Sequence, residues 1–95
     1  MTKPTDIFVT AQVAQALGRL SLAQHGQFNR LVEAIRMAPQ AGQVYARDGQ
    51  DRLLRIISAA DVHLVYTITY RVARDHIFLV DLVVAEWSPN HVDMS

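Results

Sequence analysis

The chain contains no cysteine in its 95 residues. Disulfide bonds, cysteine nucleophiles and thiolate metal sites are therefore excluded. It also has no excess of either charge, because nine lysines and arginines balance nine aspartates and glutamates. Proteins that bind nucleic acid over a wide surface usually carry a basic excess. This composition therefore excludes a large basic groove and permits only a small local basic patch. Lys3 is the only lysine, and such a patch would consist of arginine, which binds phosphate as a fork.

Long apolar runs are also missing. No segment approaches the roughly 20 apolar residues that cross a bilayer, and the start, MTKPTDIFVT, lacks the apolar stretch of a signal peptide. A chain of this length forms one domain around one core. We therefore expect a soluble, cytoplasmic protein with no membrane contact, in which one domain spans residues 1–95 and residues 88–95 form a flexible tail.

The first third of the chain predicts a strand followed by two helices. Asp6 to Val9 is rich in β-forming residues, and Thr10 after it can cap a helix over residues 11–20. Ser21 opens a second helical pattern, which starts either there or nearer Gln27 and ends before Pro39. We expect the two helices to form an antiparallel hairpin.

From Gly42 onward the apolar period changes to two, which predicts strands. Asp48-Gly49 is a strong turn signal, and short polar turns separate the later strands. The expected strands cover residues 43–47, 52–58, 62–72 and 76–85. The fold class is therefore α+β, with an N-terminal strand, a two-helix hairpin and an antiparallel sheet that the helices cover on one face.

Alternation along the strands assigns side chains to the two faces of this sheet. Leu64, Tyr66, Ile68 and Tyr70 are expected under the helices, together with Phe78, Val80, Leu82 and Val84. The open face would then present His63, Thr67, Thr69, Arg71 and Asp81, and by the same parity Arg55. Asp81 is expected as a salt-bridge partner of Arg55 or Arg71, or as a general base.

Apolar residues are expected among those polar side chains on the open face. A contiguous apolar patch usually marks a partner surface. The sequence therefore predicts a protein partner there, or a second copy of this chain, on a surface formed by Leu53, Ile57, Val65, Leu79 and Val83.

Four segments carry a resemblance to a known family. They are the strand DIFVT entering a helix, LVEAIRMAPQAGQVY, LLRIISAADVHLVYTI with its strand arginine and tyrosine, and the final strand HIFLVDLVVAEW. Their order and spacing from Asp6 to Trp87 are similar to those of the RelE/ParE superfamily of bacterial type II toxins.

The resemblance implies a RelE-like fold and a toxin neutralised by a cognate antitoxin protein. Ribosome-dependent members of the family cleave mRNA without a metal, using the RNA 2′-hydroxyl as nucleophile, and thereby inhibit translation. Members of another branch poison DNA gyrase. The alternative for this chain is therefore the same fold used as a binding module without nuclease activity, either a gyrase-directed toxin or an inactive relative.

The family's residue roles transfer only in part. Arg55 occupies the place of a strand arginine that contacts phosphate, and His63 stands where another arginine is usual. The C-terminal tyrosine or histidine and the family's lysines are missing. The catalytic candidates are then Arg55, His63 and Glu86, and Arg52, Arg71 and Trp87 are candidates for substrate binding. The four histidines show no metal-ligand spacing, so we expect no metal and no cofactor.

Overall fold

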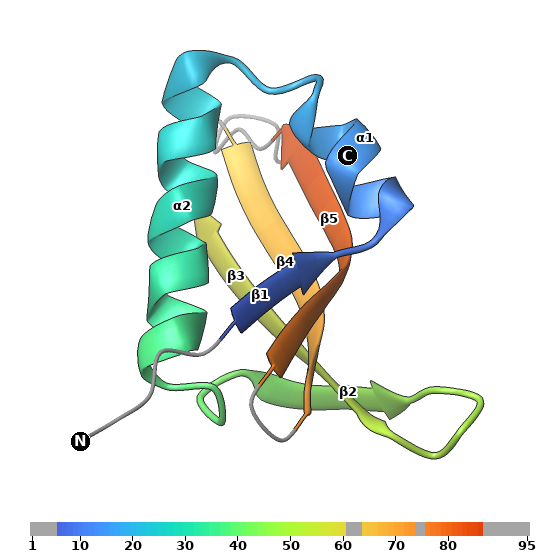
Figure 1. Ribbon diagram of the computed structural model, residues 1–95. Coiled ribbons are helices and arrows are strands. Elements are labelled where there is room, and N and C mark those ends of the chain that lie inside the picture. Colours follow the sequence, from blue (N-terminus) through green and yellow to red (C-terminus); the bar gives the residue numbers. More distant parts are fainter. Residues whose placement is uncertain (1–5, 61–63, 74–75, 87–95) are drawn as a thin grey trace, which may run out of the picture.

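The computed structural model describes residues 6–60, 64–73 and 76–86 and has the expected α+β class (Figure 1). No helix in these ranges is long and apolar enough to cross a bilayer. The predictions for His63, Trp87 and the 88–95 tail lie outside the described residues. Along the chain the elements are β1 (Asp6–Val9), α1 (Ala11–Leu17), α2 (Leu22–Met37), β2 (Gln43–Arg47), β3 (Leu53–Ala60), β4 (Leu64–Val72) and β5 (His76–Glu86).

Both helices begin at side-chain caps. The Thr10 hydroxyl accepts a hydrogen bond from the Val13 amide, which confirms the predicted cap of α1. Ser21 and Gln24 form a capping box at α2, where each side chain accepts a hydrogen bond from the backbone of the other. This reciprocal cap satisfies two amides that otherwise have no partner within the helix, so α2 starts at Leu22 and not near Gln27.

The sheet has the strand order β1-β5-β4-β3-β2. β2 to β5 pair antiparallel, as expected, but β1 pairs parallel with β5. The sheet is therefore mixed, and the prediction of a purely antiparallel sheet was wrong for its first strand. β5, the last strand, is the one that pairs with β1, and both helices and three strands lie between them in the chain. A connection of this length permits parallel pairing.

One core lies between the sheet and the two helices. α1 packs on β5, whereas α2 packs on β3 and β4, which Figure 1 shows as two helices covering different strands. The expected coverage of one face is thus confirmed, although the helices do not pack along each other as a tight hairpin. The buried residues are Val13 from α1, Phe28, Leu31 and Ile35 from α2, Tyr66, Ile68 and Tyr70 from β4, and Ile77, Leu79 and Leu82 from β5.

The face assignment of β3 was wrong. Arg55 lies opposite Tyr70 and Ile57 lies opposite Ile68, so these side chains share the helix-covered face with the buried residues of β4. Leu53 has the same parity. Both faces of β3 carry apolar residues, and alternation alone therefore could not decide which of them meets the helices.

The face assignment of β5 was wrong for its first half. Thr69 lies opposite Asp81 but Tyr70 lies opposite Leu79, so Val80 is an extra residue, a β-bulge. A bulge reverses the alternation on one side of it. Ile77 and Leu79 are consequently fully buried. The face away from the helices, called the uncovered face below, carries Phe8, Leu54, Ile56, Ser58, Val65, Thr67, Thr69, Arg71, Phe78, Asp81 and Val83.

Candidate functional site: an arginine hollow and an edge groove

Arg55 and Tyr70 together bind the loop between α2 and β2. The Arg55 guanidinium donates to the carbonyls of Gln40 and Gly42, at 3.2 and 2.8 Å, and to the Gln40 side chain at 2.7 Å. The Tyr70 hydroxyl accepts from the Gly42 amide and donates to the Pro39 carbonyl, each at 2.9 Å. All five bonds hold the end of α2 against the sheet.

The Tyr70 hydroxyl needs a glycine next to it. A Cβ added to Gly42 would lie 2.8 Å from the Tyr70 ring and closer still to its hydroxyl oxygen. Burial raises the pKa of the Tyr70 phenol above its usual value, against the smaller opposite effects of the Gly42 amide and the Arg55 charge. The hydroxyl therefore stays protonated and keeps its proton for the Pro39 carbonyl.

Four arginines line one open hollow of ≈ 550 Å³ beside this loop. Arg47–Asp51 and Arg52–Asp48 are ion pairs. Arg55 and Arg71 form no ion pair within the described part of the chain, and Arg55 donates only to neutral oxygens. Among the residues that the structure describes, the positive charge of these two side chains is therefore uncompensated. The hollow, called the arginine hollow below, is lined by Gln40, Arg47, Asp51, Arg52, Leu53, Arg55, Arg71, Val72 and Ala73.

The turn between β2 and β3 positions two of these arginines. Asp48 accepts hydrogen bonds from the amides of Gln50 and Arg52 and from the Arg52 side chain, at 2.8 to 3.0 Å. Bonds to the charged carboxylate, first of all from the Arg52 amide, lower the pKa of Asp48. Asp51 takes the left-handed φ of 63°, and its carbonyl accepts from Arg47 at 3.0 Å. The turn thus sets both Arg47 and Arg52 at the mouth of the hollow.

The structure brings together only part of the predicted site. Arg52, Arg55 and Arg71 line the same hollow, as a phosphate site requires. Glu86 does not join them, because it lies opposite Leu64 at the other end of β4 while Arg55 lies opposite Tyr70. That separation is six residues of strand, about 20 Å. His63 and Trp87 lie outside the described residues.

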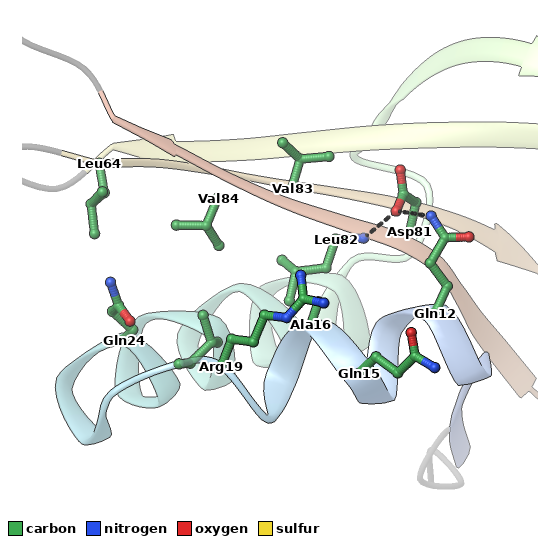
Figure 2. A pocket seen from close by; sticks show the side chains of 11 residues that line it. Gln12, Gln15, Ala16, Arg19, Gln24, Leu64, Asp81, Leu82, Val83 and Val84 are labelled. Carbon is green, nitrogen blue, oxygen red and sulfur yellow. Dashed lines mark hydrogen bonds between the residues drawn. The ribbon is translucent and has the colours of Figure 1, made fainter.

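A second hollow, of ≈ 590 Å³, runs between α1 and the outer edge of β5 (Figure 2). β1 pairs with β5 only as far as Leu79, and in the described residues no strand pairs with the outer edge of β5 from Asp81 to Glu86. The hollow, called the edge groove below, is lined by Gln12, Gln15, Ala16, Arg19, Leu20, Gln24, Leu64, Asp81, Leu82, Val83 and Val84.

Asp81 belongs to the edge groove. Its carboxylate accepts from the Gln12 side chain at 2.8 Å and from the Leu82 amide at 3.0 Å, as Figure 2 shows. The predicted ion pair with Arg55 or Arg71 was therefore wrong. Asp81 lies opposite Thr69 in the sheet, at the outer edge of β5 that β1 leaves unpaired, and no feature of the sequence indicated its contact with Gln12.

The predicted partner surface is divided between the two faces. Val65 and Val83 lie on the uncovered face, and Val83 is half exposed. Leu53 and Ile57 point to the helix side, where Ile57 packs against the core, and Leu79 is inaccessible. The prediction that Leu79 is exposed was thus wrong, because the bulge at Val80 directs its side chain to the helix side.

Arg47 and Arg19 were missed as candidate site residues. Arg47 directly precedes the Asp48-Gly49 turn, and β-hairpin pairing brings it opposite Leu53, next to Arg52. That signal was present in the sequence. Arg19 follows the end of α1, and its place beside β5 depends on tertiary packing alone.

No protein-family model, curated protein or solved structure gives a significant match to this chain. The two hollows and the residues that line them are therefore the features that bear on function.

Proposed function

We propose that this protein is a RelE/ParE-like toxin that binds the phosphate backbone of mRNA in the arginine hollow and thereby inhibits translation. The observation that carries the proposal is the convergence of four arginines on one hollow, from β2, the β2–β3 turn, β3 and β4. Two of them have no carboxylate partner in the described residues. Guanidinium groups bind phosphate in bidentate geometry.

The position of Arg55 supports phosphate binding. Its hydrogen bonds to the Gln40 and Gly42 carbonyls fix the guanidinium before a ligand arrives. A donor that is already oriented loses less conformational entropy on binding. The neutral oxygens around it leave its positive charge available to an anion, in agreement with the phosphate-contacting role that the family resemblance implies.

Cleavage makes a further demand on the hollow. Attack of a 2′-hydroxyl on the adjacent phosphorus forms a cyclic phosphate and expels the 5′-oxygen, so one group must accept a proton and another must supply one. Arginines stabilise the charge on the phosphate oxygens in this step. Among the described residues Asp51 is the only carboxylate that lines the hollow. For cleavage we therefore assign the base to Asp51 in place of Glu86, and solvent water supplies the proton to the departing 5′-oxygen.

Controlled expression in bacteria tests this proposal. The wild-type chain should arrest growth with mRNA cut during translation, and Arg52→Gln with Arg71→Gln should abolish the arrest. Arg30→Gln is the matched control, because Arg30 is exposed on α2 and lines neither hollow. Arrest with intact mRNA and stalled replication would instead support a gyrase-directed toxin. Normal growth with a folded wild-type protein would refute the toxin proposal.

A second candidate function, a protein-binding module, is favoured by the edge groove. An unpaired strand edge can accept an extended peptide as an additional strand. The groove offers apolar contacts from Leu82 and Val84 and a cation, Arg19, that has no ion pair in the described residues. An acidic, extended segment of a cognate antitoxin fits this combination.

Titration of the purified protein with the antitoxin tests this second candidate. Arg19→Glu should weaken the complex about tenfold or more, since it sets like charges against each other. Arg30→Glu carries the same charge change on exposed α2 and should leave the affinity unchanged. Equal affinities of the two variants would remove the edge groove from the interface, and self-association in sedimentation would indicate a homodimer instead.

A further inference from the structure

The uncovered face carries a group of aromatic rings close to the arginine hollow. Phe8 on β1 lies opposite Phe78 on β5, and their ring centroids are 5.5 Å apart. The ring of His76 lies 5.0 Å from Phe8 and 6.0 Å from Phe78. The planes of the three rings lie within 27° of one another. Phe8, His76 and Phe78 are called the ring platform below.

Neither helix covers the ring platform. Ile7 packs against the core, so its neighbour Phe8 points to the opposite face of the sheet, where 43% of it is exposed. Phe78 stands between Ile77 and Leu79, which are both fully buried on the helix side. The bulge at Val80 is what gives Phe78 this direction. Two phenylalanines therefore form an accessible apolar surface on adjacent strands.

Arg71 connects the ring platform with the arginine hollow. It lies opposite Phe78 across β4 and β5, and its guanidinium carbon is 4.4 Å from the centroid of the Phe78 ring. The same residue lines the arginine hollow. Apolar rings and a positive charge that no described carboxylate neutralises thus meet at a single residue.

We propose that the ring platform stacks the unpaired bases of single-stranded RNA whose phosphates lie in the arginine hollow. This inference rests on the proposed function and adds to it a surface that binds the bases of the same RNA. Aromatic side chains on a sheet surface stack splayed bases, whereas the bases of a duplex are already stacked on each other. Phe78 already contacts the Phe8 ring and the Arg71 guanidinium, whereas Phe8 is 43% exposed, so a base reaches the ring platform at Phe8.

The charge distribution favours this ligand over a protein segment. An apolar protein surface would fit Phe8 and Phe78 but would place no negative charge at Arg71. A single-stranded RNA presents a flat ring and a phosphate in every nucleotide, which matches the contact between the Arg71 guanidinium and the Phe78 ring. Arg71 above Phe78 can also contribute a cation–π contact to a stacked base.

Fluorescence anisotropy with two labelled probes tests the inference. The first is an unstructured 12-nucleotide RNA, and the second is the same ribose–phosphate backbone without bases. Phe8→Leu should weaken RNA binding about tenfold, within the range for the loss of one stacking contact, and leave the abasic probe unaffected. Phe8→Trp should bind RNA at least as tightly as the wild type. Tyr45→Leu, which removes an exposed ring outside the platform, should change neither affinity.

Each opposite result has a distinct meaning. Unchanged RNA affinity of Phe8→Leu, or equal binding of the two probes by the wild type, would overturn the ring platform while the arginine hollow could still bind phosphate. If Arg52→Gln then bound neither probe, the result would support phosphate binding in the arginine hollow without base stacking on the ring platform. Failure of the folded wild-type protein to bind either probe would overturn the proposed RNA binding and the platform with it. Thermal unfolding of each variant at the wild-type temperature shows that a loss of binding is not caused by a loss of fold.

Discussion

Arg55 and Tyr70 face each other across β3 and β4, and both bind the backbone of the loop that follows α2. Arg55 approaches the carbonyl of Gly42 and Tyr70 approaches its amide, so one glycine is held from two strands. A side chain to which the family resemblance assigns a phosphate contact therefore also has a structural role. Loss of activity in an Arg55 variant must be compared with its stability before it is interpreted as chemistry.

Tyr70→Phe should destabilise the protein. The change removes only an oxygen, but it leaves the Gly42 amide and the Pro39 carbonyl without their partner. An unsatisfied buried polar group costs about 1–3 kcal/mol, and the urea midpoint should fall accordingly. Tyr45→Phe is the control, because Tyr45 is 61% exposed and its change should stay within about 0.5 kcal/mol. Equal midpoints for the two variants would contradict the role assigned to the Tyr70 hydroxyl.

Gly42→Ala should also destabilise the fold, since the new methyl group overlaps the Tyr70 side chain. Overpacking of this kind costs about 1–3 kcal/mol. Gly49→Ala offers a matched comparison, because a Cβ at position 49 meets open space and the residue has no positive φ. Denaturant unfolding of both variants should separate them clearly. A Gly42→Ala protein as stable as the Gly49→Ala protein would show that the loop moves freely.

Asp48→Asn should reveal the acid sensitivity of the β2–β3 turn. Hydrogen bonds and the Arg52 charge lower the pKa of Asp48 in the folded protein below its ordinary value of 3.8. The unfolded state therefore takes up this proton first as the pH falls, and the stabilisation is present above that ordinary value and lost through the lower folded pKa. The wild type should be more stable than Asp48→Asn at neutral pH, and the difference should disappear in acid. Unfolding curves from pH 7 to 2 measure it, and a difference independent of pH would contradict the prediction.

Leu79→Lys should unfold the protein, whereas Val83→Lys on the same strand should not. Leu79 is fully buried and Val83 is 50% exposed. Burial of an unpaired charge belongs to the largest effects of single substitutions, about 4 kcal/mol or more. Circular dichroism during thermal unfolding distinguishes the two variants. A folded Leu79→Lys protein would indicate that β5 pairs with β4 without the bulge, with residue 79 on the uncovered face.

Local signals allowed most elements to be predicted from the sequence. Thr10 and Ser21 stand before their helices as caps, and Asp48-Gly49 separates β2 from β3, so these features follow from residues that are neighbours in the chain. The strands β1 and β2 have the predicted bounds. The helix side of β4 was also predictable, because Tyr66, Ile68 and Tyr70 alternate with polar residues.

The positions that were wrongly predicted depend on contacts between distant segments. The face to which Arg55 points is set by its pairing with Tyr70, fifteen residues later in the chain. Alternation could not predict it, because β3 is apolar on both faces. Leu79 is directed by a bulge that appears only when β4 and β5 are paired. For the candidate site, the three arginines Arg52, Arg55 and Arg71 were identified from the sequence. The separation of Arg55 from Glu86 follows only from the sheet.

The bulge at Val80 makes the register of β5 as important as its composition. If the same strand paired with β4 without the bulge, Val80 would lie opposite Tyr70, Leu79 would lie on the uncovered face and Phe78 would lie on the helix side. Deletion of Val80 would remove the bulge and leave Leu79 opposite Tyr70 and Phe78 opposite Arg71, so both residues would keep their faces. A relative of this chain that lacks this one residue would therefore present the same surface chemistry, and an alignment that ignores the gap would compare inward residues with outward ones.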